Sequence, residues 1–193
     1  MKKPTLTLPP SEPVMLHACC APCSGAIVEW MLQHEIRPTI FYFNPNIYPY
    51  EEYAIRRDES RRHAEALGLQ WIEGEYNHQA WLEAVKGLEN EPERGSRCLK
   101  CFKFRMAATA AKAREMLYGC ITTTLASSRW KSQAQIDEAG AYAESTEGVT
   151  YWQQNWRKDG LTERRAALLR EYNFYNQTYC GCEFSMQPHE GRC

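Results

Sequence analysis

Seven of the nine cysteines in this 193-residue chain lie in three short clusters. The clusters are Cys19, Cys20 and Cys23, then Cys98 and Cys101, then Cys180 and Cys182. The N-terminal segment is rich in proline and lacks the apolar core of a secretory signal, so we expect the chain in the cytoplasm. Thiols stay reduced there, and clustered reduced thiols indicate a metal site or a redox site.

The spacing of the first four of these cysteines distinguishes between metals. Zinc sites usually take thiolates two residues apart, because both thiolates must reach one tetrahedral ion. Adjacent side chains point apart, so Cys19 and Cys20 more easily reach separate corners of an iron–sulfur cubane. Cys98 and Cys101 open a predicted helix, whose N-terminus favours thiolates. Together these four residues predict a [4Fe–4S] site, with a structural zinc site or simple buried thiols as the alternatives.

The remaining clustered cysteines suggest other roles. A disulfide between Cys180 and Cys182 would close a small, strained ring, and strain makes a disulfide easy to reduce. Gly181 between them supplies the backbone freedom that the turn needs. The spacing predicts a redox-active pair beside the cluster, with free thiols in a mobile segment as the alternative. Cys23 is either a further ligand, a thiol near the substrate, or a packing residue at a helix N-terminus.

Strands and helices that would position these thiols alternate along the chain. Apolar and β-branched runs predict strands over residues 14–18, 37–44, 69–74, 119–125 and 148–152. Helical patterns cover residues 24–34, 51–68, 78–91, 98–117, 131–145 and 161–175, and Ser24 is predicted to cap the first helix. The alternation predicts a Rossmann-like α/β fold, a parallel sheet of about five strands flanked by helices. We expect residues 1–13 to be a flexible N-terminal tail and residues 14–193 to be a single α/β catalytic domain.

The predicted topology gives the position of the site. Ligands of such sheets bind beyond the carboxyl ends of the strands, near the point where the strand order reverses. The first cysteine cluster follows the first predicted strand, and the segment 127–129 follows the fourth. A strand order of 3-2-1-4-5 makes these two loops neighbours at the reversal point. The sequence therefore predicts a Cys-rich metal site at the C-terminal ends of the strands.

The chain resembles the cobalamin-independent epoxyqueuosine reductases of the QueH type in five ordered segments. These are LHACCAPCSG, FNPNIYPYEEYAIRRDE, RCLKCFKFRM, TTTLASSRWKS and YCGCEFS, spread over residues 14 to 185. The resemblance implies reduction of epoxyqueuosine to queuosine at the wobble position of tRNA, the last step of queuosine biosynthesis. An external electron donor is implied with it.

The same resemblance implies roles for the cysteines. It places a [4Fe–4S] cluster on Cys19, Cys20, Cys98 and Cys101, and a redox-active pair at Cys180 and Cys182. It also implies a second, mononuclear iron, for which Cys23 is the candidate ligand.

The implied fold is related to the PP-loop (HUP) enzymes. Their glycine-rich pyrophosphate loop is replaced by cysteines from residue 19 onward, so we expect no use of ATP. This absence disfavours one alternative, another iron–sulfur tRNA-modifying enzyme such as a thiolation enzyme. The adjacent cysteine pair disfavours the other alternative, a zinc-stapled RNA-binding module.

The charge distribution fits a tRNA substrate, although the net charge is only −1. Segment 93–131 contains nine Lys and Arg against two Glu, a local charge of +7, which predicts a basic face for phosphates beside the proposed cluster. A second basic patch is expected at Arg56, Arg57, Arg61 and Arg62. We expect Tyr48, Tyr50 or Trp130 to be exposed and to stack on an unpaired base. No run of about 18 apolar residues occurs, so no contact with a membrane is expected.

Overall fold

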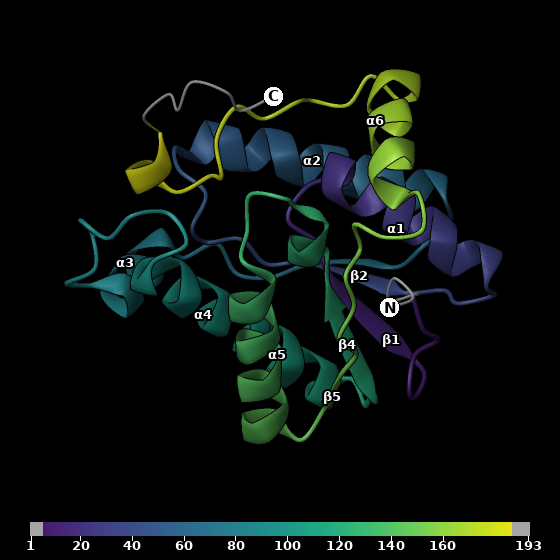
Figure 1. The fold of residues 1–193 in the computed structure, drawn as a ribbon, viewed down its shortest axis with the longest axis horizontal. Coiled ribbons are helices and arrows are strands. Elements are labelled where there is room, and N and C mark those ends of the chain that lie inside the picture. Colours follow the sequence, from purple (N-terminus) through teal and green to yellow (C-terminus); the bar gives the residue numbers. More distant parts are fainter. Residues whose placement is uncertain (1–5, 187–193) are drawn as a thin grey trace, which may run out of the picture.

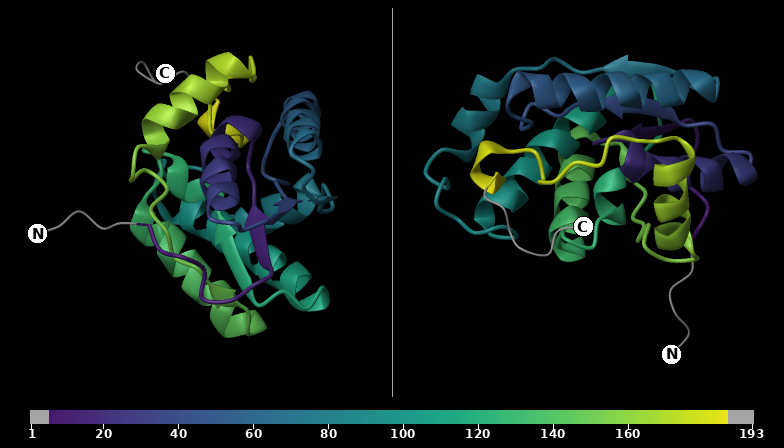
Figure 2. Two further views of the ribbon diagram at one scale, coloured as in Figure 1. Left: turned by 90° about the vertical axis from the view of Figure 1, so that its right-hand side faces the viewer. Right: turned by 90° about the horizontal axis from the view of Figure 1, so that it is seen from above.

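A computed structural model describes residues 6–186 of the chain. Its strands are β1 (Val14–His17), β2 (Thr39–Tyr42), β3 (Trp71–Glu73), β4 (Cys120–Thr123) and β5 (Thr150–Tyr151). Its helices are α1 (Ala21–Gln33), α2 (Tyr50–Ala66), α3 (His78–Val85), α4 (Ser96–Glu115), α5 (Gln133–Glu147) and α6 (Leu161–Glu171), with 3₁₀ turns at Thr124–Ser127 and Glu183–Ser185. Helices α1, α2 and α6 cover one face of the sheet, and α4 and α5 cover the other (Figures 1 and 2).

The five strands form one parallel sheet in the order β3-β2-β1-β4-β5. The predicted Rossmann-like fold and the predicted strand order are therefore confirmed. Leu16 of β1 lies opposite Ile40 of β2 on one side and Thr122 of β4 on the other. The order reverses between β1 and β4, so the carboxyl ends of these two strands are neighbours and open the crevice that such sheets use for ligands.

The central strand β1 is buried at every residue, as expected for a parallel strand covered on both faces. Its last residue, His17, is fully buried and bonds through Nδ1 to Thr123 Oγ1 (2.8 Å) and through Nε2 to the Phe43 carbonyl (3.2 Å). Desolvation by burial lowers the pKa of His17 to about 3, so the ring is neutral. His17 is thus a core residue that joins the carboxyl ends of β1, β2 and β4.

Several helix boundaries differ from the predictions, and α6, for example, ends at Glu171 and not at residue 175. Helix α1 begins at Ala21, with Cys20 as the N-cap, so Ser24 is not the cap. The Ser24 hydroxyl instead lies inside the first turns and donates to the carbonyls of Cys20 (3.2 Å) and Ala21 (3.1 Å). Helix α3 ends at Val85, because Lys86 is extended and the following residue has a positive φ. The earlier start of α1 places the first cysteine cluster directly on a helix N-terminus.

The described part of the predicted tail contacts the β5–α6 connection. Leu6 is buried, and its N–H donates to Asp159 Oδ2 (3.0 Å). The carbonyl of Thr7 accepts from Gln154 Nε2 at 3.0 Å. Residues 1–5 lie outside the described residues, and the boundary at residue 14 stays a prediction. Within residues 6–186, no helix has both the length and the apolar character needed to cross a membrane.

Helix α5 packs closely on β5 at a glycine. A Cβ at Gly140 would lie 2.3 Å from the ring of Tyr151, well inside van der Waals contact. The hydroxyl of Tyr151 donates to Asp137 Oδ1 (3.3 Å), and Asp137 lies one turn before Gly140 on α5. The approach of helix to strand therefore requires glycine at this position.

Gly140→Ala should destabilise the domain by about 1–3 kcal/mol, because the added methyl group must displace the Tyr151 ring, whose hydroxyl is bonded to Asp137. Urea denaturation followed by circular dichroism measures the change. Adding Tyr151→Val to the same chain should restore part of the lost stability by removing the ring. A single variant as stable as the parent chain would contradict the packing described here.

Candidate active site

The first cysteine cluster lies where β1 ends and α1 begins. Cys19 and Cys20 occupy the connection, and Cys23 lies in the first turn of α1. Their Sγ atoms all lie within 4.8 Å of one another, with 3.8 Å between Cys19 and Cys20. Among the described residues, this is the group compact enough to hold a metal ion, and it contains no carboxylate or imidazole. Soft thiol donors alone favour iron–sulfur clusters, zinc or copper(I) over hard cations.

The three thiols differ in how readily they ionise. Hydrogen bonds from the thiols of Cys20 and Cys23, followed by the charges of Lys131 and Arg105, hold the pKa of Cys19 well below its usual range. Burial raises the pKa of Cys20 well above its usual range. The hydroxyl of Thr124 donates to Cys19 Sγ (3.3 Å). The cluster therefore stabilises one thiolate, which is the form that binds metal.

Cys98 and Cys101 lie in the first two turns of α4, as the CxxC spacing predicts. Cys98 Sγ accepts from the backbone N–H of Arg94 (3.3 Å), whereas Cys101 is buried in an apolar cluster with Trp81 and Cys182. Burial raises the pKa of Cys101, and the charge of Arg105 opposes that rise. The same guanidinium favours the thiolate of Cys19, so one cation lies near both of the first two cysteine clusters.

The third cluster has one partly exposed thiol and one buried thiol. Cys180 is partly exposed, and the thiol of Cys182 donates to Ser185 Oγ (3.4 Å). Burial raises the pKa of Cys182 to about 12, so this thiol is protonated at neutral pH. Both cysteines are free in the structure. Gly181 between them has φ +129°, a conformation that L-residues avoid.

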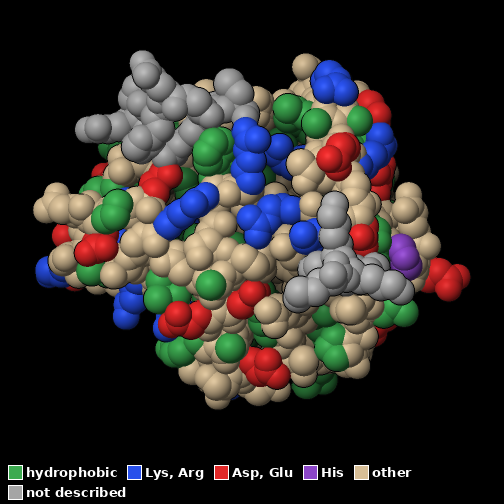
Figure 3. All heavy atoms as spheres, viewed as in Figure 1, with side chains coloured by type: hydrophobic (Ala, Val, Ile, Leu, Met, Phe, Trp, Pro, Cys, Tyr) green, Lys and Arg blue, Asp and Glu red, His purple; other side chains and the backbone are tan. Residues whose placement is uncertain are grey.

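All three clusters reach one cavity of about 460 Å³, a volume suited to a nucleoside-sized group. Cys20 and Cys101 are buried behind its wall, and the other five clustered cysteines line it. Figure 3 shows Lys and Arg side chains gathered on this face of the molecule. The basic lining residues are Arg56, Arg94, Arg97, Arg105, Arg129, Lys131, Arg157 and Arg165, against a single acidic lining residue, Glu93.

The basic face predicted from segment 93–131 lies beside the cysteine clusters, as the lining of the cavity, to which Arg94, Arg97, Arg105, Arg129 and Lys131 contribute. Arg97 and Arg105 are each 2% exposed and point inward. Lys103, Lys112 and Arg114 each form an ion pair with a glutamate. The positive potential is therefore concentrated in the cavity, because the helix turns part of its charge inward and neutralises part of the rest.

The second predicted basic patch, on α2, does not form an exposed group of unpaired cations. Arg56 is buried, and both Arg57 and Arg61 pair with Glu73. The aromatic residues behave as expected, since Tyr48, Tyr50 and Trp130 are all exposed. Trp130 lies on the rim of the cavity, with the guanidinium of Arg129 stacked 4.7 Å from its ring centroid.

Several polar residues of the cavity carried no signal in the sequence. Asn46, Gln135 and Gln177 each line it with a buried side-chain oxygen that accepts no hydrogen bond from residues 6–186. Gln177 is oriented by its amide nitrogen, which donates to Cys20 Sγ (3.1 Å). Buried acceptors without partners are rare, so this wall suits a ligand rich in hydroxyl or amino donors. Isolated Asn and Gln residues follow no spacing rule that could have identified them.

The chain matches a protein-family model described as "Epoxyqueuosine reductase QueH" over residues 14–188. A curated QueH from Histophilus somni is 42% identical over 187 residues, covering 96% of this chain and 77% of the relative. The QueH of Acinetobacter baylyi is 41% identical over 191 residues, covering 97% of this chain and 88% of the relative. The QueH of Thermotoga maritima is 34% identical over 176 residues, covering 90% of this chain and 90% of the relative.

One solved structure resembles the whole fold. It is a crystal structure of a "predicted subunit of tRNA methyltransferase" from Methanocaldococcus jannaschii, with a TM-score of 0.56. The two chains are 11% identical, and the match covers 92% of this chain and 94% of that chain. At this identity the likeness concerns the fold alone, which agrees with the expected HUP-related class.

Changing Cys19 or Cys20 to serine should remove most of the metal that co-purifies with the chain under anaerobic conditions, and Cys23→Ser should lower it. Each change takes one soft donor out of a group of three. Elemental analysis of the purified protein measures the loss. Cys120→Ser is the matched control, since Cys120 is a buried cysteine of β4 that does not line the cavity. Unchanged metal in all three cluster variants would contradict the assignment of this group as a metal site.

Proposed function

We propose that this chain, which belongs to the epoxyqueuosine reductase QueH family and is thus an oxidoreductase, reduces epoxyqueuosine to queuosine at the wobble position of tRNA. This is the last step of queuosine biosynthesis and takes place in the cytoplasm. One observation carries the proposal beyond family membership: three cysteine clusters from distant parts of the sequence line, or lie directly behind, one basic cavity of nucleoside size.

The chemistry needs both electrons and protons. Removing the epoxide oxygen breaks two C–O bonds, forms a carbon–carbon double bond and releases water, which consumes two electrons and two protons. Cys180 and Cys182 supply both on forming a disulfide, because two thiols release two electrons and two protons. An external electron donor then returns the pair to the dithiol form.

The four-cysteine ligand set remains our proposal: Cys19, Cys20, Cys98 and Cys101 hold a [4Fe–4S] cluster, and Cys23 contributes to a site for a second, mononuclear iron. The donor chemistry fits, because the thiols are soft and largely buried, and one is stabilised as a thiolate. When bound, these groups supply single electrons and a Lewis acid.

The protein's own side chains bind and orient the nucleotide. A base paired or stacked in the anticodon loop cannot reach a buried thiol, so the modified base must turn out into the cavity. Arg157 and other cavity cations neutralise the flanking phosphates. Trp130 offers a stacking surface at the rim. The unpaired oxygens of Asn46 and Gln177 accept hydrogen bonds from the ring hydroxyls of the substrate.

Replacing Arg129 and Arg157 with glutamine should weaken binding of every tRNA to a similar degree and reduce the salt dependence by about one unit of slope per charge. Fluorescence anisotropy at several salt concentrations measures both effects. Lys112→Gln is the control, because Lys112 is paired with Glu115 and does not line the cavity. If the double variant bound as tightly as the parent chain at low salt, the cavity would not be the docking surface.

Changing both Cys180 and Cys182 to serine should leave bound iron and colour intact while slowing conversion of epoxyqueuosine about 100-fold or more, because no dithiol remains to supply the electron pair. Nucleoside mass spectrometry of the digested tRNA measures conversion. A strong chemical reductant should restore part of the rate. Loss of iron in this variant would mean that the pair ligates the cluster and that the proposed ligand set is misassigned.

A further inference from the structure

The chain that follows α6 returns across the cavity wall as a strap, which we define as residues 175–182. Three successive carbonyls of this strap are held by hydrogen bonds. The carbonyls of Tyr179 and Cys180 accept from the two terminal nitrogens of Arg56, at 3.2 and 3.1 Å. The carbonyl of Gly181 accepts from the backbone N–H of Tyr48 at 2.8 Å. The backbone on both sides of Cys180 is therefore fixed.

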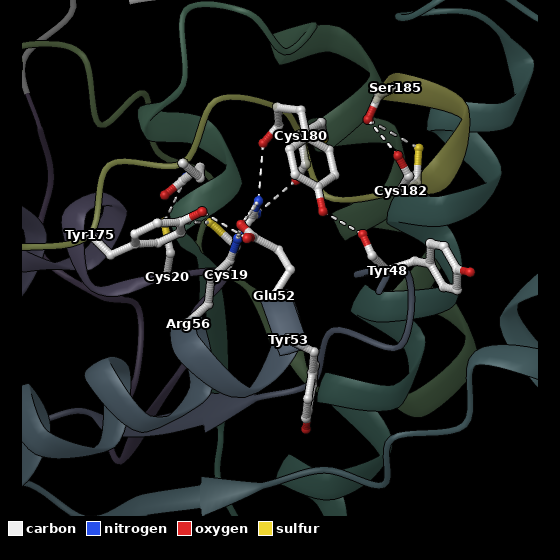
Figure 4. A network of polar contacts seen from close by, with 12 residues as sticks. Cys19, Cys20, Tyr48, Glu52, Tyr53, Arg56, Tyr175, Cys180, Cys182 and Ser185 are labelled. Carbon is white, nitrogen blue, oxygen red and sulfur yellow. Dashed lines mark hydrogen bonds and ion pairs between the residues drawn. The ribbon is translucent and has the colours of Figure 1, made fainter. Parts of the chain in front are cut away.

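Arg56 is itself fixed by a buried ion pair. It is 2% exposed, and its Nε donates to Glu52 Oε1 (2.7 Å) one turn earlier on α2. The other carboxylate oxygen of Glu52 accepts from the Tyr175 hydroxyl (2.7 Å) at the start of the strap. Figure 4 shows Arg56 between Glu52 and the strap, with its nitrogens directed at both. Lysine cannot replace this arrangement, because it lacks the planar fork of donors.

The strap approaches Arg56 closely at Gly181, the residue between the two cysteines. A Cβ at Gly181 would lie 3.2 Å from a terminal nitrogen of Arg56 and 3.0 Å from Ile47. The positive φ of Gly181 adds a second reason, since it is strained for any other residue. Glycine between the two cysteines thus allows both the close contact with the guanidinium of Arg56 and the backbone conformation of the turn.

We propose that Arg56 is a positioning residue that stabilises the dithiol form of the Cys180–Cys182 pair by holding the peptide units around Cys180. The inference rests on the proposed function, in which this pair is redox-active. Both cysteines are free in the conformation that Arg56 holds, and the Cys182 thiol bonds to Ser185. A disulfide needs Cβ atoms about 3.8 Å apart, so on this proposal its formation takes the Cys182 thiol from Ser185 and acts on the peptide units that Arg56 holds.

The consequence is an equilibrium that favours reduction. Conversion of the dithiol to the disulfide releases two electrons and two protons to an oxidant, and contacts made only by the dithiol oppose that step. The hydrogen bonds of Arg56 to the strap are such contacts. Arg56 therefore makes the oxidised pair easier for the external electron donor to regenerate, through its bonds to the backbone of the strap.

The test uses the iron-loaded protein under anaerobic conditions, in mixtures of reduced and oxidised dithiothreitol. The oxidised reagent takes the two electrons and two protons and becomes the reduced reagent. After acid quenching, alkylation and tryptic digestion, one peptide spanning residues 171–192 contains Cys180 and Cys182 and no other cysteine. Its mass gives the disulfide fraction directly and requires no substrate.

Arg56→Lys should shift the equilibrium toward the disulfide by about tenfold, because at least one charge-assisted bond to the strap is lost. Tyr175→Phe, which removes only the hydroxyl that bonds to Glu52, should shift it about threefold in the same direction. Arg61→Lys is the matched control on the same helix, since Arg61 contacts Glu73 and not the strap. It should leave the equilibrium unchanged.

An unshifted equilibrium in a folded Arg56→Lys variant would overturn the inference. If that variant does not fold, the Tyr175→Phe variant decides in the same way. Failure of the proposed function has a different signature: the Cys180→Ser, Cys182→Ser double variant would convert epoxyqueuosine at the parent rate. The two results are independent, because the equilibrium is measured in the absence of tRNA.

Discussion

The pairing of β1 with β4 is the constraint on which the rest of the site depends. It makes the carboxyl ends of two strands neighbours, although more than 100 residues separate them in the sequence. Buried His17 joins the two strand ends by its bond to Thr123. Just beyond the strands, the backbone N–H of Cys19 donates to the hydroxyl of Thr124. The first cysteine cluster and the loop that carries Lys131 are placed together as a result.

Charge compensation is the second condition that the site satisfies. Thiolates and buried cations are each costly to remove from water, and each lowers the cost of the other. Arg105 and Lys131 favour the thiolate of Cys19, and Arg165 lies beside Cys23. Lys103 and Lys112 on α4 are instead paired with glutamates. The cations that line the cavity stabilise thiolates and also attract phosphate. The net charge of −1 for the whole chain therefore gives no indication of the positive potential in the cavity.

The strand order and the cysteine clusters were predictable, because apolar periodicity and residue spacing are local properties of the sequence. The direction of a side chain is not local. Arg56 is one of four arginines on α2, and only packing shows that it points at the strap while Arg57 and Arg61 point at Glu73. For the same reason, the sequence does not distinguish Arg105, which lines the cavity, from Lys103 and Lys112, which pair with glutamates. Gln177 acquires its role from a contact with Cys20, 157 residues away.

The central claim is that the cysteine-lined cavity removes the epoxide oxygen from a tRNA nucleoside. The most direct measurement incubates the anaerobically purified protein with tRNA carrying epoxyqueuosine and a chemical reductant, and then identifies the nucleosides by mass spectrometry. Our account predicts that queuosine, lighter by one oxygen, replaces epoxyqueuosine. It also predicts that Cys19→Ser abolishes this conversion and Cys120→Ser does not. Unchanged epoxyqueuosine in the presence of bound, metal-loaded protein would contradict the account.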